Sequence, residues 1–568
     1  MGPPSLSLQL GVHTGLAREL RQQQPMIFKE SSETRKLGFP PVVMPGDLRN
    51  DLYLTLDRGT FEKEMVGLLA TARNIEVRMG VYDRSGMEVP GAVVPATGPP
   101  GSGPSLPAVF YHSNNPCWNE TIRLEVPTEQ FQAEGTHLRL EFRHCSVKEK
   151  QEKKLFGFSW MELMQPDHTV IEDGPHELPV FKCDNQERLN PGLYLRKSDI
   201  GGGQDAFQRS LKESVTVQTL LCSTKLTQNV DLMSLLKWRA SPERIPEILG
   251  RIMKTGGEEI VKFLQDVLDA LFSMFSTEDG NSTAHSGLVF HVLVHILAIL
   301  KEPKFEQFQP VIDAYISDHF AAALVYKGLL SCVKHCTDMV PSTDRQDPIR
   351  KCFQSLGHVF RFIVASRQLF ARATGGQNED SFKLEVHLLF NSFNKMLSYQ
   401  TDVVLPTQII FLTNLASVFP SLVQVMSVMD VAKLVTLTLD SLGMEQEHGR
   451  ERSKQLHRAA LLAARDAVTS QLWADPASRR LLLPACLDHV RQHLQSRTEV
   501  PEAIGLIRDV IQQLKADKAR EEEGWSQDVI TLAEKCIGPL GVAIVVEQEL
   551  VEQEEELGEL EQEEQLEE

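Results

Sequence analysis

The densest cluster of chemically active side chains is a run of positive charge around residue 150. It consists of Arg143, Lys148, Lys150, Lys153 and Lys154, with Glu149 and Glu152 interspersed. Guanidinium and ammonium groups at this density bind phosphates or anionic lipid head groups through charge-assisted hydrogen bonds. The alternative is a solvated turn in which the two glutamates pair with neighbouring lysines. The residues alone leave both interpretations open.

Two apolar runs flank this cluster and must position it. His137–Phe142, HLRLEF, alternates apolar and polar residues with the period of two that is typical of a half-buried strand. The apolar pattern resumes at Leu155–Trp160, LFGFSW. We therefore expect two strands that carry the cations on the loop between them.

The same strand pattern extends over the first 185 residues. About eight short runs are separated by Gly, Pro, Asn and Asp turns: LSLQL, DLYLTL, NIEVRMGVY, AVFYH, TIRLEV, HLRLEF, LFGFSW and HELPVFKC. That pattern predicts an antiparallel β-sandwich at residues 1–185, with an irregular loop at Gly91–Pro107. A linker at 186–213, which contains three consecutive glycines, follows it.

From residue 214 the period becomes helical. Gly257–Phe275 repeats apolar residues at helical spacing, and similar segments continue to residue 545, joined by short polar or proline-containing links. This pattern predicts an α-solenoid of stacked helix pairs at 214–545, irregular and armadillo- or HEAT-like. Residues 546–568 form a low-complexity acidic tail.

Charge and cysteine content narrow the function classes. The formal net charge is −19, but twelve Glu lie in the last 22 residues, so the rest of the chain carries only −7. A nucleic-acid-binding domain is normally basic, so we expect no nucleic-acid partner. Nine scattered cysteines without framework spacing and the absence of a signal-peptide pattern indicate a cytoplasmic protein. We expect any membrane contact to be peripheral.

No catalytic or metal-binding motif is present in the sequence. Nucleophile elbows, phosphate-binding loops, zinc-protease motifs and dinucleotide fingerprints are absent, so we expect no enzymatic activity and no cofactor. Cys332 and Cys336 lie one helical turn apart beside His335, which is better explained by a buried helix face than by a metal site. Asp57 and Asp83 are too few for a calcium-dependent C2 module.

Several long motifs in order resemble the dedicator-of-cytokinesis (DOCK) family. They are RKLGFPPVVMPGDLRNDLYLTL, YHSNNPCWNETIRL, HLRLEFRHCS, EKKLFGFS and STKLTQNVDLMSLLKW. The similarity looks closest to the subgroup that contains dedicator of cytokinesis 3 and 4. The resemblance implies a multidomain β + α chain, in which a C2-like sandwich, the first DOCK-homology region, precedes an armadillo-like helical scaffold and the acidic tail.

The resemblance also implies a ligand and a site. Related members bind phosphatidylinositol trisphosphate through basic residues of two loops of this sandwich. In this chain Lys63 and Arg73 match basic positions of the first loop, and Arg143, Lys148, Lys150, Lys153 and Lys154 supply the second. Between Lys63 and Arg73 the family has another lysine, where this chain has the apolar stretch Glu64–Thr71. Its Met65, Val66, Leu68 and Leu69 either insert into a bilayer interface or pack on the rim of the sandwich.

Family members activate Rac-type small GTPases by nucleotide exchange, through a second homology region that we expect to lie beyond the end of this chain. An N-terminal SH3 domain is also expected to be missing, so the chain resembles a fragment, a truncated isoform or a degenerate paralogue. We therefore predict a non-catalytic scaffold in Rac signalling that is recruited to phosphoinositides of the plasma membrane. The alternatives are a protein-interaction solenoid with a purely structural sandwich, and part of an exchange factor for Rac.

Overall fold

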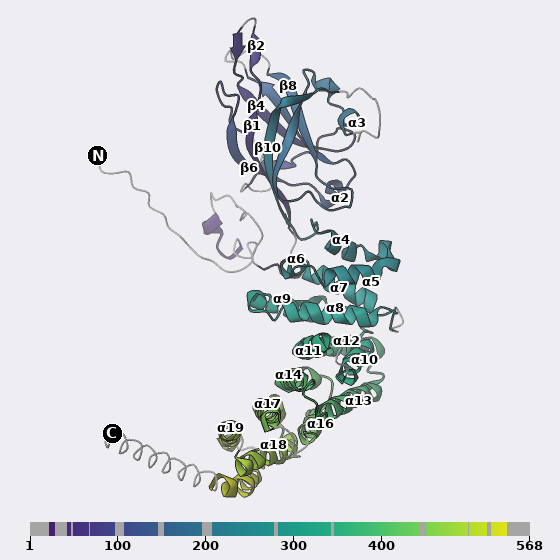
Figure 1. Cartoon of the computed structure of the whole chain (residues 1–568), viewed down its shortest axis with the longest axis vertical. Coiled ribbons are helices and arrows are strands. Elements are labelled where there is room, and N and C mark those ends of the chain that lie inside the picture. Colours follow the sequence, from purple (N-terminus) through teal and green to yellow (C-terminus); the bar gives the residue numbers. More distant parts are fainter. Residues whose placement is uncertain are drawn as a thin grey trace, which may run out of the picture. The chain divides into compact units, whose positions relative to one another are not determined.

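The computed structural model describes most of the chain. The described residues are 22–28, 42–46, 49–66, 69–96, 107–145, 153–195, 207–277, 282–341, 346–442, 450–497, 499–519 and 524–541. The chain divides into two compact units, with the boundary between Met233 and Ser234. Figure 1 shows strands in the first unit and helices in the second.

The first unit is an antiparallel β-sandwich, as the sequence predicts. Its strands are β1 (Asn50–Thr60), β4 (Ile75–Tyr82), β5 (Val93–Pro95), β6 (Cys117–Leu124), β7 (His137–His144), β8 (Lys154–Glu162), β9 (Gly174–Lys182) and β10 (Arg209–Ser223). They form one sheet in the order β4–β7–β8–β9–β10–β1–β6–β5. Residues from both halves of this sheet share a single apolar core, so the halves face each other as two layers.

A second, small sheet lies outside this order. It is a hairpin of β2 (Glu64–Val66) and β3 (Leu69–Thr71), in which Val66 pairs with Leu69. The apolar stretch that departs from the DOCK pattern is therefore a hairpin inserted after β1. Figure 1 shows β2 at one end of the sandwich.

Strand β7 shows how the period of two builds the core. Leu138, Leu140 and Phe142 are fully buried in the apolar core. The alternate residues point to the other face, and they are buried too, because the chain after β9 folds over them with η2 (Gln186–Arg188) and α3 (Pro191–Tyr194). The Tyr194 hydroxyl lies 2.7 Å from Nε2 of His137. The outer face of β7 is thus a second, polar interior.

The sandwich extends further along the chain than residue 185. β10 pairs with β1 from Asn50↔Ser223 to Thr60↔Ser214 and also pairs with β9, so it is a central strand of the sheet. The predicted linker at 186–213 and the predicted start of the helical region at 214 are both corrected by this pairing. Val215 and Val217 alternate with polar residues and are fully buried, which is a strand pattern that the helical interpretation overlooked.

One predicted strand is not a strand. The run AVFYH, Ala108–His112, forms only an isolated bridge at Phe110 and then a turn. His112 has a φ of 48°, in the left-handed region, which ends any extended conformation there. The run LSLQL lies outside the described residues. The remaining six predicted runs correspond to β1, β4, β6, β7, β8 and β9.

The second unit is helical. Its first helices are α4 (Val230–Leu236), which spans the boundary, α5 (Ile245–Ile252), α6 (Gly257–Lys262), α7 (Leu264–Phe275), α8 (Ser286–Ile299) and α9 (Gln309–Ala314), followed by the π-helix η6 (Tyr315–His319). The chain continues with α10 (Tyr326–Asp338), α11 (Gln346–Gln354), α12 (Leu356–Thr374), α13 (Glu379–Leu397), α14 (Leu405–Leu415), α15 (Phe419–Leu422), α16 (Val428–Asp440), α17 (Arg450–Thr469), α18 (Pro476–Ser496) and α19 (Val500–Ala519).

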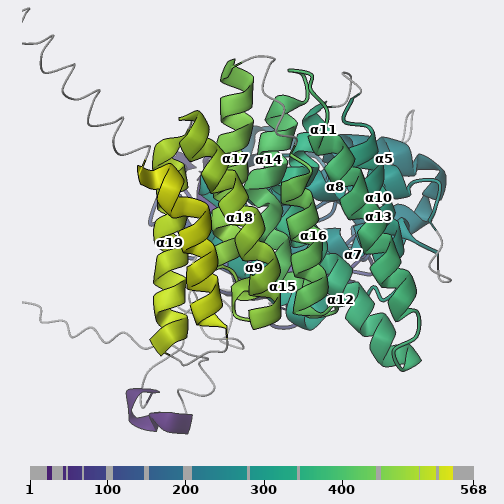
Figure 2. The ribbon, with the colours of Figure 1, turned by 90° about the horizontal axis from the view of Figure 1, so that it is seen from below.

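These helices contact one another in two successions. α11, α14, α17 and α19 each contact the next, and so do α10, α13, α16 and α18. Figure 2 shows the helices of this unit side by side. Stacked neighbours of this kind bury a shared apolar surface that no single helix pair could bury alone.

One apolar stretch in this unit is long enough to cross a bilayer by length and composition. It is Leu405–Leu422, which spans α14 and α15, and half of it is buried among the other helices. Gln408 is fully buried in it and donates hydrogen bonds to the carbonyls of Met396 and Tyr399. A core helix of a helical unit has these properties, so the stretch is weak evidence for a membrane span.

Candidate functional site

The two loops that the sequence singled out meet at one end of the sandwich. β1 ends there and β4 begins there, and the Cα pairing of Ile75 with His144 and of His144 with Lys154 sets β4, β7 and β8 side by side. The hairpin β2–β3 belongs to the same end, because it lies between β1 and β4 in the chain. We call this end, with the described residues that follow β1, β5, β7 and β9, the loop end.

Asn74 ties three of these loops together. Its side-chain oxygen accepts a hydrogen bond from the backbone N–H of His112 at 2.8 Å, and its Nδ2 donates to the carbonyl of Cys145 at 3.0 Å. Nδ1 of His144 accepts from the backbone N–H of Asn74 at 3.3 Å. Asn74 itself is 6% exposed, so these bonds are shielded from water. The loop end is therefore a connected surface rather than a set of independent loops.

Lys63 and Lys154 are two exposed cations of this end that have no ion pair among the described residues. Lys154 opens β8, and Lys63 follows Phe61, whose N–H bonds to the carbonyl of Asn114. Since an ammonium free of a carboxylate can exchange water for a phosphate, these two lysines fit an anionic ligand best.

Lys153 is exposed but neutralised. Its ammonium donates a hydrogen bond to the carboxylate of Glu76 on β4, and that bond raises the pKa of Lys153. The Lys153 side chain is 55% exposed and the Glu76 side chain 14%. A phosphate at this position has to compete with Glu76, so Lys153 contributes less than its exposure suggests.

Arg73 is a structural cation. Its guanidinium lies 4.3 Å from the centre of the Phe156 ring, its Nη1 lies 3.6 Å from the Glu213 carboxylate, and its side chain is only 14% exposed. Glu213 is fully buried and also pairs with Lys182. A buried carboxylate is costly unless it is neutralised. Arg73 therefore holds Glu213 in place and has little surface left for a ligand.

Arg143 is bound in a similar way. Its Nη2 donates to Glu141 at 2.8 Å and to the side-chain oxygen of Gln186 at 3.0 Å, and Glu141 is buried and also paired with Arg139. The Arg143 side chain is 18% exposed. Lys148 and Lys150 lie outside the described residues. The structure thus separates the five described cations of the predicted site into exposed lysines and internally paired arginines.

Sequence reasoning missed two lysines of the loop end. Lys182 ends β9 and pairs with Glu213, and Lys212 on β10 has its Nζ 3.7 Å from Glu62. The Lys212 side chain is 79% exposed. Lys212 was missed because the residues of β10 were assigned to the linker and the helical region, although the alternation in SVTVQT identifies a strand. Lys182 lies on the predicted strand β9, but its pairing with Glu213 on β10 is not visible in the local sequence.

The two aspartates considered for calcium lie at opposite ends of the sandwich. Asp57 is near the end of β1, whereas Asp83 follows the end of β4, which runs the other way. Asp83 accepts hydrogen bonds from the Ser85 hydroxyl and the Met87 N–H, and the Ser85 bond lowers its pKa. Across the described ranges no group of three or more His, Cys, Asp or Glu side chains is arranged to hold a metal ion.

The cysteine pair of the helical unit has a third neighbour. Cys336 on α10 lies beside Cys352 on α11 and His291 on α8, and the interaction with Cys352 lowers the pKa of the Cys336 thiol. The Cys336 and Cys352 thiols are buried, and Cys332 is half-buried. The contacts join three helices, which agrees with the interpretation of this pair as part of a buried helix face.

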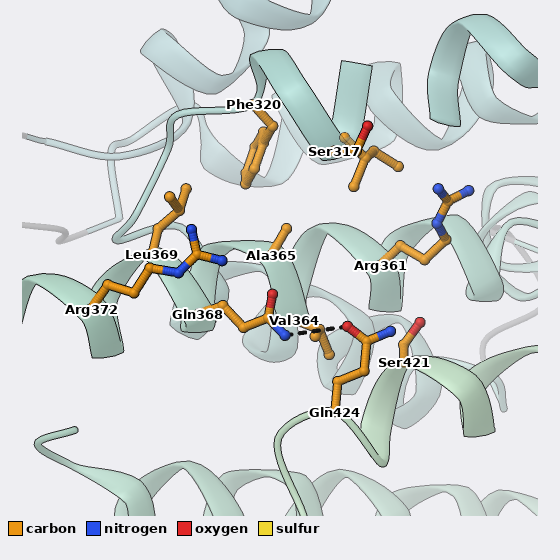
Figure 3. Close-up of a pocket in the computed structure, with 11 residues that line it drawn as sticks. Ser317, Phe320, Arg361, Val364, Ala365, Gln368, Leu369, Arg372, Ser421 and Gln424 are labelled. Atoms are coloured by element: carbon orange, nitrogen blue, oxygen red, sulfur yellow. Dashed lines mark hydrogen bonds between the residues drawn. The ribbon is translucent and has the colours of Figure 1, made fainter. Parts of the chain in front are cut away.

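A separate hollow of about 310 Å³ lies within the helical unit. It is lined by residues of η6, α12 and α15, among them Ser317, Phe320, Arg361, Arg372 and Ser421. Figure 3 shows Arg361 and Arg372 on opposite sides of it, with Gln368 donating to Gln424 at 3.2 Å between them. Arg361 is paired with Asp313, while Arg372 is exposed and has no ion pair among the described residues.

Two family models match the chain and together cover both units. The model of the C2 domain in Dock180 and Zizimin proteins matches residues 45–231, and the model of the dedicator of cytokinesis (DOCK) TPR region matches residues 241–540. The chain belongs to the DOCK family. The first match ends after β10, which agrees with the corrected extent of the sandwich, and the second describes the helical unit as a TPR region.

Curated members of the DOCK family are similar over nearly the whole chain. Human dedicator of cytokinesis protein 3 is 41% identical over 91% of this chain and 26% of its own length. Mouse dedicator of cytokinesis protein 4 is 39% identical over 93% of this chain and 26% of its own length. The chain therefore spans about a quarter of the length of these relatives.

Among solved structures, a C2 domain of plant Extended Synaptotagmin 1 is 13% identical, covers 31% of this chain and 97% of that domain, and has a TM-score of 0.18. A score this low supports no argument. The assignment of the sandwich to the C2 type rests on the DOCK family model and on the antiparallel sheet itself.

Proposed function

We propose that the sandwich binds polyphosphorylated inositides at the loop end and that the helical unit serves as a scaffold in Rac-type small-GTPase signalling. On this proposal the protein is cytoplasmic, is recruited peripherally to the plasma membrane, and carries out no nucleotide exchange with the residues of this chain. The observation that carries the proposal is the pair of exposed lysines, Lys63 and Lys154, on two loops of one end of a C2 sandwich.

The distribution of charge supports an anionic partner at this end. Lys63, Lys153, Lys154 and Lys212 expose ammonium groups there; Lys153 pairs with Glu76 and Lys212 with Glu62, whereas Lys63 and Lys154 have no ion pair among the described residues. A head group with several phosphates can engage several ammonium groups at once, whereas a single monovalent ion cannot. Multivalent engagement favours polyphosphorylated inositides over singly charged lipids.

Vesicle flotation with the whole chain tests this proposal. Vesicles of phosphatidylcholine with and without each polyphosphorylated inositide are compared at low and physiological ionic strength. We expect inositide-dependent binding that weakens as salt is raised, because the attraction is electrostatic. Absence of binding at low ionic strength would refute the lipid-binding half of the proposal.

A second function, as a protein-interaction module, is supported by the hollow of the helical unit. Arg372 on its rim is an exposed cation, and the neighbouring amides and apolar floor fit an acidic partner segment. A partner recovered by the whole chain and lost with Arg372→Glu, in the absence of lipid, supports this function. The exposed Arg239 outside the hollow, changed to Glu, is the matched control.

Participation in a Rac exchange factor is the third function. It is tested by a nucleotide-exchange assay on Rac with this chain alone, in which we expect no acceleration. Acceleration above the intrinsic rate would show that the residues of this chain suffice for exchange.

A further inference from the structure

The segment that the sequence misidentified as a strand displays apolar side chains to solvent. Val109, Phe110 and Tyr111 are 44%, 38% and 67% exposed. A soluble surface rarely presents three consecutive apolar residues without a partner for them. The chain beside them runs along the end of β1, where the Gly59 N–H bonds to the carbonyl of Pro116, so the three residues belong to the loop end.

The backbone of this segment is held on both sides. Before it, Nε1 of Trp118 donates to the carbonyl of Ala108 at 2.8 Å. After it, the N–H of His112 donates to Asn74, and His112 adopts its left-handed φ. Phe110 bridges to Ile75 on β4, and its ring meets that of Trp118 edge-on with centroids 6.4 Å apart. The exposure of Val109 and Tyr111 is therefore built into the fold.

Apolar and cationic groups converge here. Asn74 connects this segment to the loop that leads to Lys153 and Lys154, and Asn114, two residues beyond His112, bonds to Phe61, two residues before Lys63. A surface that combines exposed aromatic and aliphatic side chains with flanking ammonium groups matches the interface of an anionic bilayer, where apolar side chains reach the acyl region and cations stay with the head groups.

We propose that Val109, Phe110 and Tyr111 form a membrane-inserting tip that enters an anionic lipid surface beside the head-group site. This inference rests on the proposed inositide-binding function and adds a second, apolar contribution to it. On this proposal the lysines draw the protein to the anionic membrane and select the head group, and the inserted tip slows dissociation from the bilayer. Tyr111, with an aromatic ring and a polar hydroxyl, suits the interfacial depth.

The test uses the whole chain and two ligands. The first is vesicles of phosphatidylcholine and phosphatidylserine that carry a polyphosphorylated inositide, and the second is the soluble inositol polyphosphate head group. The double variant Val109→Asn/Tyr111→Ser removes the tip without adding charge and spares Phe110, which packs on Trp118. The control is Met87→Ser, because Met87 is 71% exposed and lies in the turn at the opposite end of the sandwich.

We expect the double variant to weaken vesicle binding about tenfold or more, in keeping with the removal of two buried apolar side chains, and to bind the soluble head group like the wild type. Met87→Ser should bind both like the wild type. An indole placed at the tip by Tyr111→Trp should be quenched by brominated acyl chains.

The inference would be overturned if the double variant bound vesicles with unchanged affinity, or if brominated lipids did not quench the indole. The exposed apolar residues would then be assigned to contact with a protein partner. A further outcome is that the wild type binds vesicles but not the soluble head group, with vesicle binding lost in the double variant. That result would support the membrane-inserting tip and refute the head-group site. If the wild type binds neither ligand, both proposals are wrong.

Discussion

Lys153 and Glu76 form a hydrogen-bonded ion pair that joins the basic loop before β8 to the edge strand β4. Glu76 is also the register partner of Arg143 across β4 and β7, so this ion pair lies beside the strand that leads into the basic loop. The basic cluster is thus partly neutralised by its own scaffold, and the charge available to a ligand is smaller than the sequence suggests.

The first prediction concerns Glu76. Glu76→Gln should strengthen binding to anionic vesicles by roughly two- to fivefold, because the Lys153–Glu76 ion pair no longer has to break before Lys153 binds a phosphate. The salt dependence of binding should steepen. The measurement is vesicle flotation over a salt series.

The control for Glu76→Gln is Glu88→Gln. Glu88 has a comparable ion pair, 2.9 Å from Arg78, but bridges to Tyr82 at the opposite end of the sandwich. It should leave vesicle binding unchanged. Equal or weaker binding by Glu76→Gln would contradict the view that Glu76 competes with the ligand.

The second prediction concerns Arg73. Arg73→Met should lower the free energy of unfolding by about 2 kcal/mol, since Lys182 is then the one ion-pair partner that the buried Glu213 keeps among the described residues. The paired change Arg73→Met/Glu213→Met should recover much of that loss. Urea unfolding of the four proteins of this cycle measures the coupling. A variant of full stability that has lost inositide binding would instead make Arg73 a direct ligand residue.

The third prediction concerns Asn74. Asn74→Ala removes the hydrogen bonds to His112 and Cys145 and should cost roughly 1–3 kcal/mol of stability. Amide exchange should rise in residues 107–117 and around Cys145, because these loops lose their common anchor. Exchange that rises uniformly over the sandwich, or not at all, would argue against Asn74 as the connecting residue.

The fourth prediction is a pH dependence. His137 is buried between the Gly135 carbonyl and the Tyr194 hydroxyl, and burial lowers its pKa to about 4. Below pH 6.5, the ordinary pKa of histidine, His137 binds a proton in the unfolded chain but stays neutral in the folded protein. The free energy of unfolding therefore falls as the pH drops from about 6.5 toward 4. This residue alone should cost on the order of 1–2 kcal/mol between pH 7 and pH 5.

The comparison for this pH dependence is His137→Gln. The glutamine amide can replace both hydrogen bonds of His137 but does not titrate. The stability of the variant should therefore fall less than that of the wild type between pH 7 and pH 5. Parallel pH profiles of the two proteins, measured by urea unfolding, would show that His137 does not supply the dependence.

Strand periodicity predicted most of the sandwich, because one face of each strand packs in a single core. β7 and β1 are clear examples, since their leucines alternate without interruption. Strand periodicity gave a wrong prediction at AVFYH. This run has the composition of a strand, but the hydrogen bond from the His112 N–H to Asn74 and the left-handed φ of His112 hold it in a turn. It also failed at β10, whose long separation from β9 in the chain hid its membership of the sheet.

The sequence predicted the loops that carry the candidate cations but not the ion pairs of those cations. The sequence identified which loops carry cations, and the strand register brings those loops to one end. Which cations are free depends on carboxylates far away in sequence, such as Glu213 for Arg73 and Glu76 for Lys153. Pairings of that range follow from the fold and not from local spacing, so Lys182 and Lys212 also escaped notice.

The most direct test of the account is charge reversal at the two exposed lysines. Lys63→Glu/Lys154→Glu should weaken binding to inositide vesicles at least tenfold, while the control Lys225→Glu, an exposed lysine beyond the other end of β10, should change it less than twofold. All three sites are exposed, so the proteins should unfold alike. Vesicle binding that survives the double reversal, with the inositide dependence intact, would contradict the assignment of the head-group site to the loop end.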